Sequence, residues 1–197
     1  MLHLIGFYDY TVILTYMSLV SAVTGILFSG QGHFSWAILC LMLSGLCDAF
    51  DGAVARSKKN RTQDEKAFGI QIDSLCDAVS FGVFPALLCY FLGVNGILGT
   101  VIVAVYVLCA VIRLAFFNVM EEKRQQTETG SGKYYRGMPV TTISMILPPF
   151  YLLRSILSAE IFIAALHILL ITSAFLFVLD FPVKKLDWSR LLPSHKS

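Results

Sequence analysis

Four aspartates stand out in this chain because they lie within two strongly apolar segments. Asp48 and Asp51 lie toward the end of the first segment, and Asp73 and Asp77 lie in the first half of the second. One carboxylate at the centre of a membrane helix costs roughly 2.5–3.5 kcal/mol on insertion scales, and four neighbouring carboxylates also repel one another. Bound divalent cations offset both costs. Since Mg²⁺ and Mn²⁺ take oxygen ligands, we predict that these aspartates hold such ions, with enough charge for a pair of them.

The spacing within each pair places both carboxylates on one face of a helix. Asp48 and Asp51 are three positions apart, and Asp73 and Asp77 are four apart, which are the separations of neighbours on a helical surface. If the helix with Asp48 and Asp51 runs toward the cytoplasm and the helix with Asp73 and Asp77 returns, the two pairs lie at comparable depth in the membrane. Paired ions held there can clamp the attacking and leaving oxygens of a phosphoryl transfer.

The elements that carry these aspartates are predicted to be membrane helices. The 197-residue chain is 56% hydrophobic and 14% charged, whereas soluble domains carry about 25% charged residues. A spanning helix needs about 20 mostly apolar residues. Six segments qualify: Tyr10–Phe28, Phe34–Ala55, Ala67–Leu92, Gly96–Val119, Val140–Leu157 and Ile161–Leu179. They use most of the chain, so we predict one all-α polytopic membrane domain over residues 1–197.

Basic residues gather in alternate connections, which predicts the orientation of the helices. Residues 56–66 contain five Lys or Arg, and residues 120–139 contain four, as does the tail after residue 183. Residues 29–33 and 93–95 contain none. The positive-inside rule then places both termini and the aspartates on the cytoplasmic side. We expect an integral protein of a prokaryotic cytoplasmic membrane, and no nucleic-acid partner at a net charge of +2.

Small residues and one arginine extend the aspartate pattern. It reads Asp48-Ala-Phe-Asp51-Gly52-Ala-Val-Ala55-Arg56, then Gly69-Ile-Gln-Ile-Asp73-Ser-Leu-Cys-Asp77. This resembles the signature of the CDP-alcohol phosphatidyltransferase family, D-x2-D-G-x2-A-R followed by G-x3-D-x3-D, at every fixed position. The spacer between the two halves, residues 57–68, is longer than is usual in the family. We assign its extra residues to a solvated loop, where insertion costs little.

The resemblance implies a reaction and roles for the signature residues. The family transfers a phosphatidyl group from CDP-diacylglycerol to an alcohol and releases CMP. Asp48, Asp51 and Asp73 would be metal ligands. Asp77 would be both a metal ligand and the general base that takes the proton of the acceptor hydroxyl. Gly52, Ala55, Arg56 and Gly69 would bind the nucleotide and its diphosphate. The resemblance also implies a homodimer.

Three further stretches resemble the phosphatidylserine synthase branch of the family, which favours L-serine as the acceptor. They are Asp73–Pro85, Arg113–Asn118 and Tyr135–Pro139. In them Arg113, Asn118 and Arg136 would bind the serine carboxylate, since a guanidinium pairs well with a carboxylate. Other acceptors stay open: glycerol 3-phosphate or an inositol phosphate would need more cationic groups, and choline would need an aromatic cage.

Two other classes of protein use intramembrane carboxylates or this fold. A carrier or proton-coupled transporter would place its aspartates at the midplane between repeated halves, whereas here they lie nearer one face and no repeat is evident. A catalytically silent scaffold would not need the whole signature. The five cysteines have no zinc-site spacing, so we interpret them as small buried hydrophobic residues.

Overall fold

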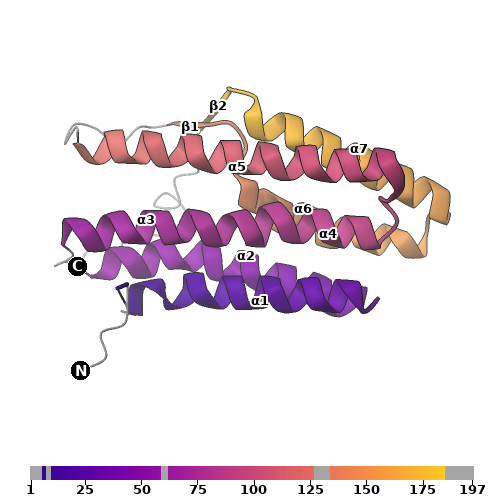
Figure 1. Ribbon diagram of the computed structural model, residues 1–197, viewed down its shortest axis with the longest axis horizontal. Helices are drawn as coiled ribbons and strands as arrows, with labels where there is room; N and C mark the ends of the chain where they lie inside the picture. The colour runs from indigo at the N-terminus through magenta and orange to yellow at the C-terminus, as the bar shows by residue number, and fades with distance from the viewer. Residues whose placement is uncertain (1–5, 8–9, 59–61, 127–133, 185–197) are drawn as a thin grey trace, which may run out of the picture.

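The computed structural model of the protein describes residues 6–7, 10–58, 62–126 and 134–184. This part of the chain is almost entirely helical (Figure 1). In chain order the elements are a 3-10 turn Tyr10–Val12, α1 Ile13–Gly30, α2 Phe34–Ser57, α3 Gln63–Asp77, a π-helical segment Ala78–Val83, α4 Phe84–Phe91, α5 Gly96–Gln126, β1 Tyr134–Arg136, a 3-10 turn Val140–Thr142, α6 Ile143–Leu152, a 3-10 turn Leu153–Ser155, α7 Ala159–Val178 and β2 Pro182–Lys184.

The helices form a bundle of antiparallel rods. α3, the π-helical segment and α4 join into one continuous rod. Figure 1 shows that the axes of α1, α2, this rod and α5 are nearly aligned with one another. α1 packs along α2, and α5 packs along α7. The turns that follow α1 and α4 contain Gly32 at φ +79° and Gly93 at φ +125°. Glycine adopts this left-handed region without steric cost, so the chain reverses there within a few residues.

The core is apolar and lies between the rod and the helices around it. Phe81, Phe84 and Tyr106 are among its largest fully buried side chains. A side chain on Gly25 of α1 would collide with Phe84, so this glycine allows α1 to approach the rod closely, as small residues do in membrane bundles. The Tyr106 hydroxyl donates to the Phe81 carbonyl at 2.9 Å, which satisfies a buried backbone acceptor within the π-helical segment.

Within the described residues, five helical segments are long and apolar enough to cross a membrane, by length and composition. They are Ile13–Gly30, Phe34–Gly52, Gln63–Phe91, Gly96–Glu122 and Ala159–Val178. These helices are typical of an integral membrane protein. The remaining predicted span, Val140–Leu157, is helical only as α6 with a 3-10 turn at each end. Pro148 and Pro149 lie inside α6 and remove two backbone donors from it.

Two strands of three residues each accompany the helices of the predicted all-α fold. β1 pairs with β2 in antiparallel register, with Tyr134 opposite Lys184 and Arg136 opposite Pro182. The Gly137 N–H then donates to the Phe181 carbonyl at 2.8 Å. The pairing joins the segment before α6 to the segment after α7. The five cysteines are free thiols, buried or half-buried, as their apolar surroundings in the sequence predicted.

Candidate metal centre between the second helix and the third

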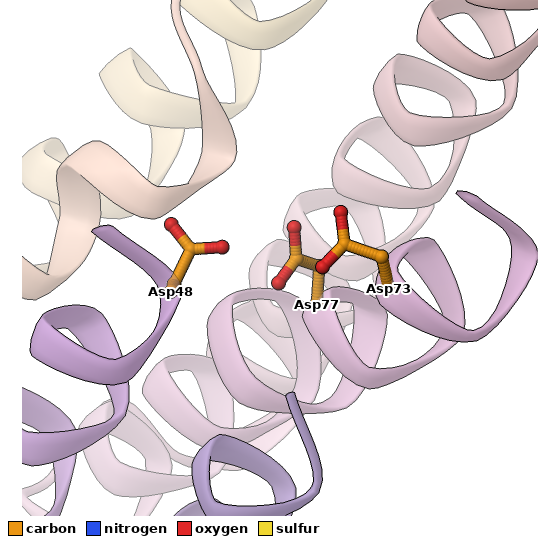
Figure 2. A group of neighbouring side chains, drawn as sticks. All are labelled: Asp48, Asp73 and Asp77. Atoms are coloured by element: carbon orange, nitrogen blue, oxygen red, sulfur yellow. The ribbon is translucent and has the colours of Figure 1, made fainter. Parts of the chain in front are cut away.

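Three of the four aspartates converge between facing helices. Asp48 comes from α2, and Asp73 and Asp77 come from α3. Each offers a carboxylate oxygen, and these oxygens all lie within 4.8 Å of one another. Figure 2 shows Asp48 pointing across toward Asp77, with Asp73 beside it on the same helix. α2 and α3 therefore bring together three of the four aspartates of the sequence pattern.

Asp51 lies next to this group. It follows Asp48 by one turn of α2, and its carboxylate interacts with that of Asp73. Its Oδ2 also accepts a hydrogen bond from the Thr15 hydroxyl at 3.2 Å. The compact group thus contains three carboxylates, with the fourth adjacent and held partly by α1.

The burial of these groups fits a bound divalent cation. Asp77 is 9% exposed, and Asp48 and Asp73 are half-buried. Among the described residues, Asp73 Oδ1 is a buried side-chain oxygen without a hydrogen-bond partner. An unsatisfied buried acceptor is costly, and adjacent carboxylates increase that cost by repulsion. Hard oxygen ligands in this number suit Mg²⁺ or Mn²⁺, so the residues present fit the predicted metal.

A change of helix geometry accompanies the centre. The π-helical segment Ala78–Val83 begins at the residue after Asp77. Short π-helical insertions are rare and often occur at functional sites. Ser80 of this segment is fully buried and accepts a hydrogen bond from Ser18 of α1 at 3.4 Å. The segment therefore connects the metal centre to a polar contact with α1.

The predicted nucleotide-binding residues flank the aspartates on the same two helices. Gly52 follows Asp51 on α2, and Gly69 lies one turn before Asp73 on α3; both are half-buried. Ala55 and Arg56 belong to the last turns of α2, but their side chains lie outside the described part of the structure. The helix backbone thus places all four at the end of the bundle where α2 stops and α3 starts.

The predicted acceptor-binding residues occupy three different settings. Arg113 of α5 is 8% exposed, and it donates from Nε to the Met138 carbonyl at 3.2 Å and from Nη2 to the Gly137 carbonyl at 3.5 Å. The carboxylate of Asp180 interacts with it electrostatically. Arg136 lies in β1, directly before the carbonyls that Arg113 holds, and its side chain lies outside the described residues.

Asn118 contacts the helix that carries two of the aspartates. Its Oδ1 accepts a hydrogen bond of 2.5 Å from Ser74, the neighbour of Asp73 on α3. The contact links α5 to α3 beside the metal centre. Ser74 was not among the predicted site residues, because a serine inside an apolar helix is more often a packing or helix-bonding residue.

The first helix contributes polar groups that the sequence pattern missed. Thr15 is 5% exposed and Ser18 is 2% exposed, and both face the aspartate-bearing helices. The signal was present, since two hydroxyl residues three positions apart lie on one face of a helix. Their role was not predictable from the aspartate pattern, which covers only α2 and α3.

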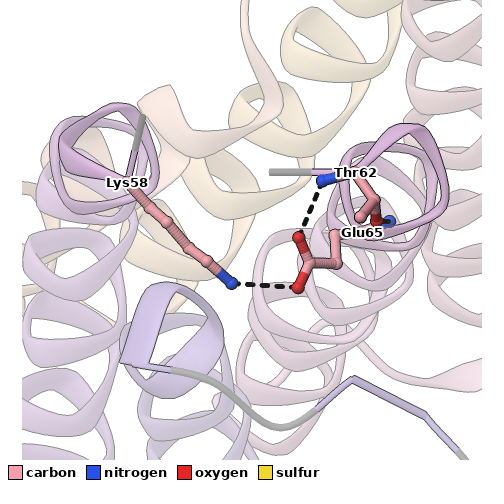
Figure 3. Close-up of polar contacts among 3 residues, drawn as sticks. All are labelled: Lys58, Thr62 and Glu65. Carbon is pink, nitrogen blue, oxygen red and sulfur yellow. Dashed lines mark hydrogen bonds and ion pairs between the residues drawn. The ribbon is translucent and has the colours of Figure 1, made fainter. Parts of the chain in front are cut away.

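The connection between α2 and α3 is shorter than predicted. α3 begins at Gln63, four residues before the expected start at Ala67. Thr62 and Glu65 form a capping box: the Thr62 N–H donates to Glu65 Oε2 at 2.8 Å, and the Glu65 N–H donates to Thr62 Oγ1 at 3.1 Å. Lys58 Nζ lies 2.9 Å from Glu65 Oε1 (Figure 3). Part of the long spacer is therefore helix, and this Lys58–Thr62–Glu65 clamp ties the two aspartate helices at their ends.

Together these features define a class: an integral membrane protein with a cluster of aspartates between two antiparallel helices that could hold a metal ion. Comparison with known sequences agrees with that class. The chain belongs to the CDP-alcohol phosphatidyltransferase family, whose sequence profile matches residues 10–179. The signature around Asp48–Arg56 and Gly69–Asp77 is the part of that match that forms the centre.

Curated relatives share about a third of their residues with this chain. An archaetidylserine synthase of Methanothermobacter thermautotrophicus is 36% identical over 167 residues, which is 80% of this chain and 66% of the relative. A CDP-diacylglycerol–serine O-phosphatidyltransferase of Saccharomyces cerevisiae is 36% identical over 129 residues, 64% of this chain and 45% of the relative. One of the same name from Helicobacter pylori is 32% identical over 135 residues, 68% of this chain and 53% of the relative. The chain thus spans about half to two thirds of these relatives.

Proposed function

We propose that this protein transfers a phosphatidyl group from CDP-diacylglycerol to L-serine, giving phosphatidylserine and CMP. The observation that carries the proposal is the convergence of Asp48, Asp73 and Asp77 within 4.8 Å at the positions of the family signature. The names of the relatives support the acceptor, because serine is common to all three. They differ in the lipid, so an archaetidyl donor is the second candidate for the group transferred.

The reaction assigns a role to each aspartate. Asp48, Asp51, Asp73 and Asp77 would hold Mg²⁺ or Mn²⁺, two ions in this proposal, and the ions would neutralise charge on the diphosphate and on the departing CMP. Asp77 also accepts the proton of the serine hydroxyl. The serine oxygen forms a bond to the phosphorus of the phosphatidyl group while the bond from that phosphorus to the CMP oxygen breaks, and CMP leaves with the electron pair. A positioned general base is typically worth 10²–10⁴-fold in rate.

The substrates are recognised by residues on either side of this centre. Gly52, Ala55 and Gly69 give the CDP group access to the helix backbone, since small side chains permit close approach, and Arg56 pairs with the diphosphate.

The serine carboxylate is bound by Arg136 and by the Asn118 amide, which Ser74 holds beside Asp73. Arg113 takes part in acceptor binding together with the Gly137–Met138 backbone that it holds.

The membrane arrangement in this proposal has six spans in one domain over residues 1–197. Val140–Ser155, comprising α6 and its two flanking turns, supplies the remaining crossing between α5 and α7. The start of α1, the end of α2, the start of α3 and the end of α5 lie toward the same end of the bundle in Figure 1. This supports one common side for the basic connections, which the positive-inside rule makes the cytoplasmic side; both termini are proposed to lie there as well. The proposed setting is a prokaryotic cytoplasmic membrane, with the protein as a homodimer.

The test is to supply the purified chain in liposomes with CDP-diacylglycerol, Mn²⁺ and one alcohol at a time. L-serine should give the largest yield of new phospholipid, identified by mass spectrometry, with ethanolamine a poor substitute because it lacks the carboxylate. A preference for glycerol 3-phosphate, an inositol phosphate or choline would leave the reaction class standing and overturn the acceptor. Repeating the assay with the ether-linked archaetidyl donor distinguishes the two lipids.

A further inference from the structure

We propose that Thr15 is a positioning residue for the metal centre: its hydroxyl fixes the carboxylate of Asp51 so that this aspartate completes the ligand set. The proposal rests on the proposed function, because it assumes that the aspartates hold metal. It adds a member from α1, which lies outside the family signature on α2 and α3.

The first observation is the hydrogen-bond partner of the Thr15 hydroxyl. It donates to Asp51 Oδ2 at 3.2 Å across the α1–α2 interface. A threonine in a helix commonly donates to a carbonyl of its own preceding turn. Thr24 does so with the Val20 carbonyl and Thr100 with the Gly96 carbonyl, each at 2.8 Å. Thr15 instead directs its hydrogen to a carboxylate on a neighbouring helix, and it is buried while doing so.

The second observation is a serine cluster that fixes the rotation of α1. Ser18 lies three residues after Thr15, so the two share a helix face. Its hydroxyl lies 2.7 Å from the Ser44 hydroxyl of α2, and the Ser44 hydroxyl donates to the Ser18 carbonyl at 3.1 Å. Ser18 also donates to Ser80 of the π-helical segment at 3.4 Å. These buried bonds connect α1 to both aspartate-bearing elements and keep Thr15 turned toward Asp51.

A hydrogen bond from a residue that does not itself bind the metal can orient a metal ligand. A partner that holds one oxygen of a ligating carboxylate sets the direction of the whole group, and loss of such a partner typically costs about 10–100-fold in metal affinity or activity. Asp51 interacts with Asp73, so a change in the direction of the Asp51 carboxylate also affects a second member of the site. Thr15 therefore acts on the metal through Asp51 and makes no contact with the substrate in this account.

The experiment compares matched variants of the full chain, purified in nanodiscs. Mn²⁺ binding is measured by the loss of the free-ion EPR signal, together with the Mn²⁺ concentration that gives half-maximal activity. Thr15→Val, which removes the hydroxyl and keeps the bulk, should raise the dissociation constant for Mn²⁺ and the half-maximal Mn²⁺ concentration by about 10–100-fold each. Thr15→Ser should restore most of the affinity. Thr15→Ala is a second variant without the hydroxyl.

Two controls on the same helix separate positioning from packing. Thr24→Val removes a hydroxyl bonded to its own helix. Ser21→Ala removes a partly buried α1–α2 hydrogen bond to the Cys40 carbonyl, which is 2.9 Å long and away from the aspartates. Both should bind Mn²⁺ like the wild type. Wild-type affinity in a folded Thr15→Val or Thr15→Ala variant would overturn the proposal, as would equal weakening by Ser21→Ala. Wild-type protein that binds no Mn²⁺ would instead contradict the proposed function.

Discussion

The two halves of the bundle use polar residues in different ways. In the half formed by α1, α2 and the α3–α4 rod, acidic and hydroxyl side chains contact one another across helix interfaces, as in Thr15 with Asp51 and Ser18 with Ser44. In the half formed by α5 to α7, the buried Arg113 holds backbone carbonyls of the segment between β1 and α6. The first half therefore fixes acidic side chains on helices, and the second fixes a connecting segment.

This difference matches the two tasks of the proposed reaction. Metal ligands must be held to a fraction of an ångström, which sites on helices achieve better than sites on loops. Selection among alcohols is a task that connecting segments commonly perform on a rigid scaffold. We call the half with α1, α2 and the rod the acidic half, and the half with α5 to α7 the basic half. Substitutions of the aspartates in the acidic half should abolish turnover. Substitutions of the arginines in the basic half should change which acceptor is used and how well it binds.

The largest effect is expected for loss of a ligand in the acidic half. Asp51→Asn or Asp73→Asn should abolish turnover while the protein still inserts, because neutral amides are poorer ligands for hard divalent ions than carboxylates. The measurement is CMP release from CDP-diacylglycerol, with circular dichroism to confirm folding. A chelator should have the same effect on the wild type, and added Mg²⁺ or Mn²⁺ should reverse it. Full turnover in excess chelator would contradict a metal site.

The next effect separates the base from the other ligands. Asp77→Asn should reduce turnover by about 10²–10⁴-fold and weaken binding of the CDP-lipid much less, because the lost step is proton transfer from the acceptor. Single-turnover kinetics and equilibrium binding of CDP-diacylglycerol measure the two quantities. If lipid binding is lost and the remaining turnover is normal, Asp77 is a structural ligand and another group takes the proton.

A smaller and more selective effect is expected in the basic half. Arg136→Ala or Arg113→Ala should raise the KM for serine about ten- to a hundredfold, since a hydrogen bond to a charged group contributes roughly 1.5–3 kcal/mol. CDP-diacylglycerol binding should change little. Arg154→Ala is the matched control, because its guanidinium lies 5.3 Å from the Phe34 ring centre, away from the aspartates. Equal effects of Arg113→Ala on serine and on the CDP-lipid would show that it acts on the whole site.

The smallest effect should come from the clamp that joins α2 to α3. Thr62→Ala removes one half of the capping box and should lower the unfolding free energy by about 0.5–2 kcal/mol, with activity retained at permissive temperature. Lys58→Ala should cost less, about 0–1 kcal/mol, since its partner Glu65 is partly solvated. Thermal unfolding in detergent measures both. A dead but folded Thr62→Ala variant would mean that this connection contacts the substrate.

The aspartate centre was predictable from the sequence because its geometry is local to two helices. The separations Asp48 to Asp51 and Asp73 to Asp77 fix a shared face on each helix, and an antiparallel pair brings the faces together. The capping box at Thr62 and Glu65 is also visible in the sequence as a Thr-x-x-Glu pattern before an apolar run, so the sequence contains the signal for the start of α3 at Gln63, four residues before the predicted start at Ala67.

Contacts between distant elements could not be obtained in the same way. The bond from Thr15 to Asp51 spans 36 positions and depends on how α1 is rotated against α2, which side-chain packing decides. Likewise, nothing local to Arg113 indicates that its guanidinium binds the carbonyls of Gly137 and Met138. The β1–β2 pairing joins segments of three residues, too short for a period-two pattern to be recognised.

The central claim is that the acidic half performs metal-dependent phosphatidyl transfer to serine, and one measurement tests it most directly. CMP release is followed in liposomes containing CDP-diacylglycerol while L-serine and Mn²⁺ are each varied, for the wild type and for Asp73→Asn. The account predicts release that requires both serine and Mn²⁺ in the wild type, with phosphatidylserine formed in equal amount, and none in Asp73→Asn. Serine-dependent release that persists without a divalent cation, or in Asp73→Asn, would contradict it.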